Sequence, residues 1–301
     1  MNGVEHMPDR TYAIFTDAFS NLPGRLLSSL DIRILPCTYF VDGEPVHYNG
    51  DIETFDSHNY YESIRQGKVI TTALVNTQSF LEHFRPCVEQ GQDILYIGLS
   101  SGVSGTYQAA VMAAQELMEE FSACKIRTVD SCGAGLGVGL LSCRASDLRA
   151  EGKTLDETAD TLEQEKLGLC EFFTVGSLEY LKRSGRVSAA TAAIGSVLNI
   201  KPLLYGDYEG HIVSCAKPRG RKKAIAAILE KYQKLALHPE NSRIFISHGD
   251  CPEEAEQLAE QVCSIAKPKE LIICPHEPFT GCHVGPGMLA LFFPGTARLD
   301  D

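Results

Sequence analysis

The segment LSSGVSGTYQAA (residues 99–110) combines three serines and two glycines between an apolar run and a predicted helix. Hydroxyl groups and free N–H groups at the start of a helix favour the binding of an anion. Gly102 and Gly105 allow a ligand to approach the backbone closely. The loop lacks the lysine of G-x-x-x-x-G-K-[ST], which argues against a nucleotide phosphate. We therefore predict an anion site that includes Ser100 and Ser101, although Ser104 could simply cap the following helix.

Two further segments carry candidate binding residues. Thr71 and Thr72 lie on a connector between two helical stretches, where a threonine pair binds a ligand or serves as a cap or turn. His283 stands among three glycines and a proline in residues 280–287, and we expect a rigid loop that presents it to a ligand or leaves it solvated. The histidines show no H-x-x-x-H or H-E-x-x-H spacing, so no metal site is predicted.

A glycine at every second position from 133 to 139 superficially resembles a dinucleotide-binding loop. This spacing misses G-x-G-x-x-G, and close packing of a helix explains it better.

A basic run, residues 217–223, contains five cations in seven residues and opens a predicted helix. Its cations oppose the helix dipole, so we interpret Arg219 and Arg221 as part of an exposed docking site for an acidic protein partner, with a solvated face as the alternative. The formal net charge of −12 disfavours general binding to nucleic acid or to an anionic membrane.

Composition is typical of a globular protein. The 301 residues are 44% hydrophobic and 22% charged, enough for one large or two medium domains. We find neither a signal peptide nor an apolar run of about 18 residues, and expect no stable membrane insertion. The eleven cysteines are odd in number and form no C-x-x-C, which predicts buried reduced thiols and a cytoplasmic protein.

The first half alternates apolar strands with helical patterns. Strands are predicted at residues 11–16, 32–40, 94–98 and 126–129, a hairpin at 42–43, and helices at 22–30, 54–66, 77–90, 104–121 and 132–150. This predicts an α/β domain with a mostly parallel sheet and helices on both faces. Because ligands bind at the carboxyl ends of such strands, the loops at 17–21, 100–106 and 130–135 are expected to share one crevice.

The second half reads as a mixed α/β domain. Helices are predicted at residues 155–167, 222–237 and 252–265, short helical pieces at 177–198, a hairpin at 208–210, and strands at 170–175, 201–205, 212–216, 244–247, 270–273 and 288–293. We expect an N-terminal domain over 1–165 and a C-terminal domain over 166–301.

Six motifs recur together in an order that resembles the DegV family, the fatty-acid-binding subunits of bacterial fatty acid kinase. They are Thr16-Asp17, Thr71-Thr72, residues 99–107 (LSSGVSGTY), 181–188 (LKRSGRVS), 219–224 (RGRKKA) and 283–287 (HVGPG). The resemblance implies a two-domain DegV-like α/β fold with one long-chain, palmitate-like fatty acid at the domain interface. Its acyl chain would lie in an apolar tunnel, and its carboxylate would meet polar loops.

By motif position, the resemblance implies that Thr72 and Ser101 contact the carboxylate, with Ser100, Thr71 and His283 nearby. Arg221 and Arg219 would serve transfer to an ATP-dependent kinase subunit, which makes an acyl phosphate for phospholipid synthesis. The resemblance implies no cofactor and no catalytic residue in this chain. Where the family usually has Thr-Ser-Gln, this sequence has Thr72-Ala73-Leu74, which changes the surroundings of the carboxylate.

Two other functional classes are weighed. An acyl hydrolase would use Ser101 as nucleophile and His283 as base, but the serine loop lacks G-x-S-x-G and no aspartate partner for His283 is evident. A DNA-binding regulator would use residues 217–223, and the acidic net charge disfavours it.

Overall fold

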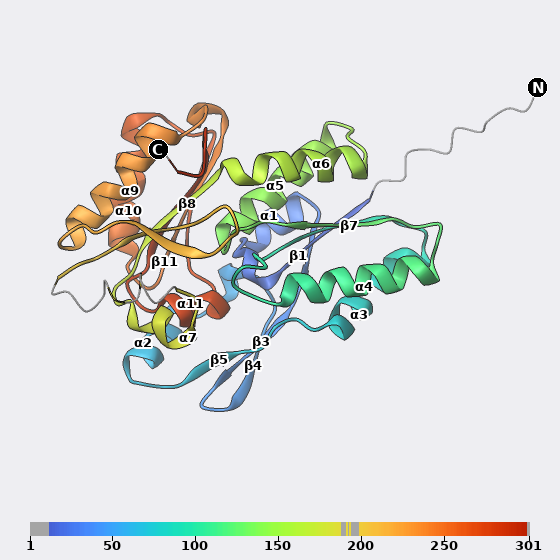
Figure 1. Ribbon diagram of the computed structural model, residues 1–301, viewed down its shortest axis with the longest axis horizontal. Helices are drawn as coiled ribbons and strands as arrows, with labels where there is room; N and C mark the ends of the chain where they lie inside the picture. The colour runs from blue at the N-terminus through green and yellow to red at the C-terminus, as the bar shows by residue number, and fades with distance from the viewer. Residues whose placement is uncertain (1–11, 188–190, 192, 194–198, 300–301) are drawn as a thin grey trace, which may run out of the picture.

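The computed structural model describes residues 12–187, 191, 193 and 199–299, which form three β-sheets and their covering helices (Figure 1). Sheet A is parallel and four-stranded, in the order β2-β1-β6-β7. Its strands are β1 (Ala13–Asp17), β2 (Ile32–Leu35), β6 (Ile94–Gly98) and β7 (Ile126–Asp130). Strands β1 and β6 are buried along their whole length because helices cover both faces, as expected for a parallel sheet.

Two helix layers cover the two faces of sheet A: α3 (Thr77–Glu89) with α4 (Thr106–Glu120), and α5 (Leu136–Ala150) with α6 (Leu155–Glu165). Alternate strand residues face the two layers. Phe15 and Tyr96 pack in the core with α3 and α4, whereas Ile14 and Leu95 pack in the core with α5 and α6.

The single strand predicted over residues 32–40 is wrong, because two strands of different sheets occupy it. Pro36 lies between them and has no N–H group with which to continue the ladder. Strand β3 (Cys37–Val41) then pairs with β4 (Glu44–Tyr48) and β5 (Ile70–Thr72) in the small antiparallel sheet B, at the bottom of Figure 1. The predicted hairpin is confirmed: Asp42 and Gly43 both have positive φ, 52° and 91°.

Several predicted helices begin or end elsewhere. The helix expected at 54–66 is a 3-10 turn, η2 (Ile52–Thr54), followed by α2 (Ser57–Arg65), whose first turn Asp56 caps. The helix expected from residue 132 begins at Leu136, because Gly135 has a φ of 55°. The remaining early elements are η1 (Ala18–Ser20) and α1 (Gly24–Ser29).

Sheet C is mixed and six-stranded, in the order β10-β9-β8-β13-β11-β12, with only β11 and β12 parallel. Its strands are β8 (Leu169–Thr174), β9 (Leu203–Gly206), β10 (Ile212–Ala216), β11 (Arg243–His248), β12 (Glu270–Pro275) and β13 (Leu289–Pro294). Helices α9 (Arg221–Leu235) and α10 (Pro252–Ile265) cover its outer face. The predicted hairpin at 208–210 joins β9 to β10 and is confirmed.

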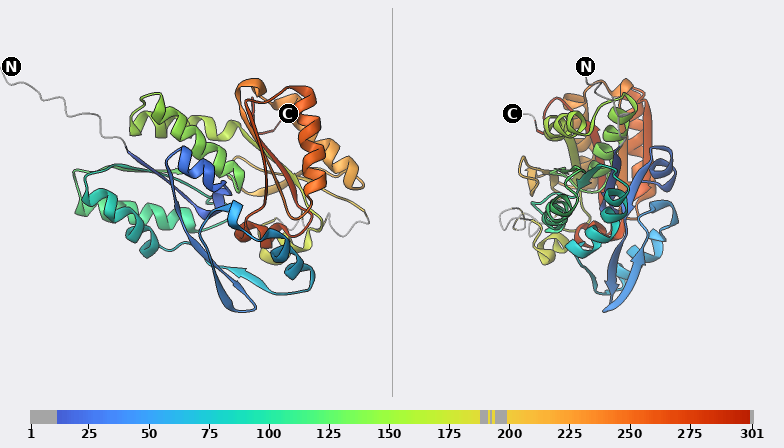
Figure 2. Two further views of the ribbon diagram at one scale, coloured as in Figure 1. Left: turned by 180° about the vertical axis from the view of Figure 1, so that it is seen from behind. Right: turned by 90° about the vertical axis from the view of Figure 1, so that its right-hand side faces the viewer.

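Helix α5 lies between the two large sheets and contacts strands of both (Figures 1 and 2). One hydrophobic core therefore runs from Ile14 of sheet A through Leu141 of α5 to Phe292 of sheet C. The chain passes from sheet A's helices to sheet C through η3 (Lys166–Gly168). A division into domains 1–165 and 166–301 stays a prediction, since the two halves share this core.

Helix α7 (Glu179–Ser184) accounts for part of the helical pieces predicted at 177–198; residues 188–190, 192 and 194–198 lie outside the described residues. The last elements are η4 (Pro239–Asn241) and α11 (Pro278–Val284). Within the described part of the chain, we find no helix with the length and apolar character needed to cross a membrane.

Candidate functional site

A cavity of about 790 Å³ lies where the carboxyl end of sheet A meets the inner face of sheet C. Its walls come from the loops after β6 and β7, the β9–β10 hairpin, the segment after α7, and α11. Most of the lining is apolar, including Phe19, Leu99, Leu181, Val187, Phe173, Ile212, Val213, Phe279, Val284, Met288, Ala290 and Phe292. The loops predicted to share a crevice do meet here, each through at least one lining residue.

Three of the predicted site residues line this cavity: Thr72, Ser101 and His283. Thr72 Oγ1 and His283 Nε2 lie 3.4 Å apart, although 211 positions separate them in the sequence. The Ser101 residue is exposed at the cavity wall. The structure therefore gathers two hydroxyls and an imidazole from β5, the β6–α4 loop and α11.

The N–H groups of the serine loop, expected to seat an anion, are engaged within the protein. The Ser101 N–H donates to both carboxylate oxygens of Asp130 (3.3 Å each), and the Gly102 N–H donates to Ser100 Oγ. The N–H groups of residues 103 and 104 both donate to the Ser100 carbonyl. The loop thus offers side-chain hydroxyls rather than these four amides.

Ser100 and Thr71 do not line the cavity. Ser100 is buried, and its hydroxyl donates to the Gly210 carbonyl at 3.0 Å, which ties the serine loop to the β9–β10 hairpin. Thr71 neighbours Thr72 on strand β5, so its side chain points to the opposite face, and it is exposed. The expectation that this pair lies on a loop or turn is wrong: both threonines are in β5, opposite Tyr39 and Phe40 of β3.

The expectation that His283 lies in a rigid loop is also wrong, because it belongs to the last turn of α11. Pro278 starts this helix, Glu277 accepts hydrogen bonds from the N–H groups of Phe279 and Thr280, and Gly285 ends it with a φ of 74°. Burial, together with the nearby cations Arg186 and Arg183, lowers the pKa of His283 to about 4. The imidazole is therefore neutral near pH 7.

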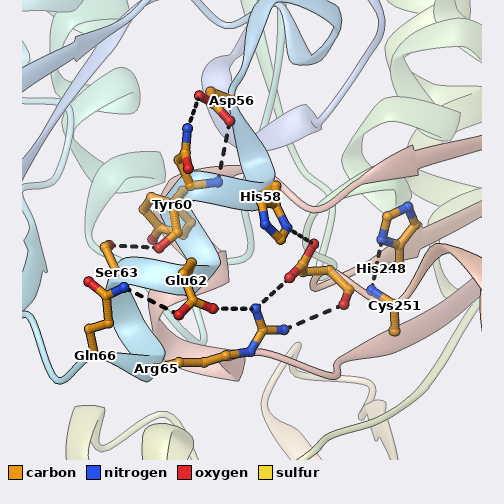
Figure 3. A network of polar contacts seen from close by, with 11 residues as sticks. Asp56, His58, Tyr60, Glu62, Ser63, Arg65, Gln66, His248 and Cys251 are labelled. Carbon is orange, nitrogen blue, oxygen red and sulfur yellow. Dashed lines mark hydrogen bonds and ion pairs between the residues drawn. The ribbon is translucent and has the colours of Figure 1, made fainter.

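Helix α2 holds both sides of the site in place. Its Tyr60 and Tyr61 hydroxyls donate to the carbonyls of Pro278 (2.5 Å) and His276 (3.0 Å), at the start of α11. At the other end of α2, Arg65 reaches the carboxylate of Asp250, which also contacts His58 (Figure 3). Because β5 follows α2 directly, these contacts fix Thr72 relative to His283.

Sequence reasoning gave no role to Arg186, a cation that lines the cavity. Arg186 is half-buried, lines the cavity and donates to the Ser184 carbonyl at 2.6 Å. It follows Gly185, the αL residue that ends α7. The position of this arginine, directly after a helix-ending glycine in the segment LKRSGRVS, is the sequence feature that could have indicated it.

Arg221 is not the exposed cation that we expected. Its guanidinium forms an ion pair with Glu254 of α10, at 2.6 Å between Nη2 and Oε2, and its side chain is only 21% exposed. The neighbouring cations Lys217, Arg219, Lys222 and Lys223 are exposed. They define what we call the basic surface.

Within the described residues, no group of three or more histidine, cysteine, aspartate or glutamate side chains could hold a metal ion. The eleven cysteines all lie in the described part of the chain, where no two of them form a disulfide.

A largely apolar cavity with a smaller set of polar lining groups, set between a parallel and a mixed sheet, defines a class of α/β proteins with a site suited to an amphiphile. Residues 11–295 match the model of a family described as "Uncharacterised protein, DegV family". A DegV domain-containing protein of Clostridium perfringens is 38% identical over 289 residues, which cover 96% of this chain and 99% of the relative. The chain belongs to the DegV family, and its two-domain fold is that of the family.

Solved structures of DegV proteins have the same fold as this chain. A DegV family protein from Thermus thermophilus, described by its fatty acid binding, superposes with a TM-score of 0.83 at 28% identity, covering 94% of this chain and 98% of that one. DegV from Bacillus subtilis, described as a fatty acid binding protein, gives a TM-score of 0.81 at 25% identity, covering 94% and 99%.

Proposed function

We propose that this protein binds one long-chain, palmitate-like fatty acid and presents its carboxylate to a separate ATP-dependent kinase subunit. The observation that carries the proposal is the cavity itself: a largely apolar chamber of about 790 Å³ whose wall includes the hydroxyls of Thr72 and Ser101 and the imidazole of His283. Cavities of this size and character are typical of sites for small amphiphilic ligands. The likeness to DegV proteins described as fatty-acid-binding supports the same ligand.

The polar groups of the cavity wall suit a carboxylate. The hydroxyls of Thr72 and Ser101 can each donate a hydrogen bond to it, and neutral His283 can donate a third from one ring nitrogen. Arg186, which lines the same cavity, supplies positive charge. Each buried methylene adds about 0.8 kcal/mol, so the acyl chain provides most of the affinity.

Presentation to a kinase requires little chemistry from this chain. A carboxylate oxygen attacks the γ-phosphorus of ATP, the bond to ADP breaks, and an acyl phosphate forms for use in phospholipid synthesis. Because the nucleophile is already deprotonated, no general base is needed, which fits a neutral His283 of low pKa. The basic surface suits an acidic face of a kinase partner in the cytoplasm.

The geometry supports the alternative function, that of an acyl hydrolase, less well. His283 Nε2 lies beside Thr72 rather than Ser101, and its Nδ1 faces Cys282 Sγ at 3.6 Å, not a carboxylate. An imidazole with a pKa of about 4 is also a weak base near neutrality.

Two assays on delipidated protein test the proposal. Calorimetric titration with palmitate is expected to give saturable binding of one molecule per chain, and p-nitrophenyl palmitate is expected to remain intact. Turnover of the ester that disappears in Ser101→Ala would favour the hydrolase. Failure of folded, delipidated protein to bind palmitate would overturn the proposal.

A further inference from the structure

One buried arginine, Arg298, joins three segments of the chain beside the cavity. It follows β13, the last strand, and only 1% of it is exposed. Its Nη1 donates to the carbonyls of Cys132 (2.5 Å) and Asp207 (3.0 Å), and its Nη2 donates to the carbonyl of Lys166 (2.8 Å). Burying a guanidinium costs free energy unless its N–H groups are paired. One side chain therefore fixes the β7–α5 loop, the β9–β10 hairpin and η3 relative to one another.

A first branch leads from Arg298 to Ser101 through the β7–α5 loop. Cys132 lines the cavity and has a φ of 50°, in the left-handed region that costs free energy for residues other than glycine. Its carbonyl accepts from Arg298, and its N–H donates to Asp130 Oδ1 at 2.9 Å. The Asp130 carboxylate in turn accepts the Ser101 N–H, at 3.3 Å to each oxygen. Arg298 thus supports the strained backbone that orients the acceptor of the Ser101 N–H.

A second branch reaches the same serine loop through the β9–β10 hairpin. The Asp207 carbonyl also accepts the Gly210 N–H at 3.0 Å, within the hairpin turn. The Gly210 carbonyl accepts the Ser100 hydroxyl at 3.0 Å. A Cβ atom at Gly102 would lie 2.6 Å from a backbone carbonyl oxygen of the hairpin, so the loop packs directly against it. The hairpin therefore holds both neighbours of Ser101.

The Ser101 hydroxyl depends on these supports because nothing else fixes it. Ser101 is exposed, and no hydrogen bond from the described residues holds its hydroxyl. A single torsion angle separates this oxygen from the backbone, so its position follows the backbone of the loop. A hydrogen bond weakens steeply once its distance and angle depart from the ideal. Thr72 is held independently, by its strand β5.

We propose that Arg298 and Asp130 are positioning residues for the contact between Ser101 and the fatty acid carboxylate. The proposal rests on the fatty-acid-binding function above and adds the residues that place one of its contacts. Neither of the two is among the described residues that line the cavity, so both act through the serine loop. Loss of Arg298 frees the loop and the hairpin that flank Ser101, and its hydroxyl no longer meets the carboxylate.

The test is a double-mutant cycle on palmitate binding, measured by calorimetric titration of delipidated protein. Arg298→Met, of similar length but without a hydrogen-bond donor, is introduced into wild type, Ser101→Ala and Thr72→Val. We expect it to raise the Kd about tenfold in wild type and in Thr72→Val, the effect of one lost hydrogen bond. In Ser101→Ala we expect a further rise of less than about twofold, because the contact that Arg298 positions is already absent.

A merely structural role for Arg298 predicts a different pattern. General loosening of the cavity would raise the Kd by the same factor in all three backgrounds, and that result would overturn the proposal, as would an unchanged Kd in wild type. If Ser101→Ala alone binds palmitate as wild type does, Ser101 is no contact and its positioning fails, while fatty acid binding stands. If folded wild type binds no palmitate, the fatty-acid-binding function itself fails.

Asp130 provides a second variant, which also decides the matter should Arg298→Met not fold. Asp130→Ala removes the acceptor of the Ser101 N–H and is expected to give the same pattern in the three backgrounds. Asp130→Asn keeps the Oδ1 atom that accepts from Ser101 and Cys132, and is expected to bind palmitate within about twofold of wild type. If Asp130→Asn binds as weakly as Asp130→Ala, the carboxylate acts by its charge, and its positioning role is overturned.

Discussion

Thr72 and Ser101 line the same cavity, from strand β5 and from the loop after β6, whereas the residue before each of them does not. Thr72 faces the cavity while Thr71 faces outward, because side chains alternate along β5. Ser101 lines the cavity while the Ser100 hydroxyl is bonded to the Gly210 carbonyl. Residue types and order pointed to both pairs. Which member of each pair lines the cavity depends on strand alternation and on a contact across 110 positions, which spacing alone does not reveal.

Replacing single residues tests these positions: Thr72→Val and Ser101→Ala are each expected to weaken fatty acid binding. Each removes a hydrogen bond to a charged carboxylate, about 1.5–3 kcal/mol or roughly ten- to a hundredfold in Kd. Isothermal titration with palmitate measures the change. Thr71→Val is the matched control, made one position away on the outward face, and its Kd is expected to match wild type. Equal affinity in all three variants would remove Thr72 and Ser101 from the site.

Buried Glu277 gives a pH dependence of stability. Burial raises its pKa to about 8, above the ordinary value near 4.5, although Thr280 and Phe279 hydrogen-bond to it. Between these values the unfolded chain releases a proton that the folded protein keeps, so this contribution is complete below about pH 4.5 and is lost as the pH rises to 8. His276 and His283, with pKa values lowered to about 3 and 4, act in the opposite sense but only below about pH 6.5.

We therefore expect the free energy of unfolding to fall from pH 6.5 to 8, and Glu277→Gln to flatten that fall. Urea denaturation at several pH values measures it. An unchanged slope in Glu277→Gln would mean that this carboxyl is already ionised in the folded protein at pH 6.5.

Helices and strands position these residues through a few backbone constraints. Pro36 splits one apolar run into β2 and β3, and so creates the small sheet whose third strand carries Thr72. Gly285 ends α11 rather than marking a loop, which is why His283 is helical. A proline or glycine signals a break in both cases. Whether the break falls between two strands or at a helix end depends on the sheets and helices that pack around it.

The glycines at the start of α5 and α4 allow a test of packing at the scale of elements. A Cβ at Gly139 would lie 2.7 Å from the Ser20 carbonyl oxygen, which belongs to the backbone and cannot turn away. Gly139→Ala is expected to lower the free energy of unfolding by about 1–3 kcal/mol in urea denaturation. At Gly105 the nearest atom would be a Leu74 methyl at 3.6 Å, and φ is −77°, so Gly105→Ala is expected to change stability by less than about 1 kcal/mol. Equal effects of the two variants would contradict the packing described for α5.

For the whole molecule, α5 joins the parallel and the mixed sheet through one core, and the cavity opens where their inner surfaces meet. Alternating strand and helix patterns predicted the parallel half well. The strand order of sheet C, in which β13 lies between β8 and β11, could not be predicted from local sequence patterns, because it depends on pairings between distant segments. Arg186 was missed for the same reason: only the folded chain brings it to the cavity.

The charge distribution leads to a prediction about transfer rather than binding. Replacing Arg219, Lys222 and Lys223 together by Gln is expected to leave the Kd for palmitate unchanged but to slow acyl phosphate formation with the kinase subunit, most strongly at low salt. Replacing Lys153, Lys267 and Lys269 by Gln is the control, because these three lysines are exposed and do not belong to the basic surface. A loss of palmitate binding with an unchanged rate per bound lipid would contradict this division of roles.

Native mass spectrometry of the purified, folded protein tests fatty acid binding most directly. We predict a population heavier than the chain by the mass of one long-chain fatty acid, identified after solvent extraction and reduced in Thr72→Val but not in Thr71→Val. Folded protein that carries no acyl chain, and acquires none when incubated with palmitate, would contradict it.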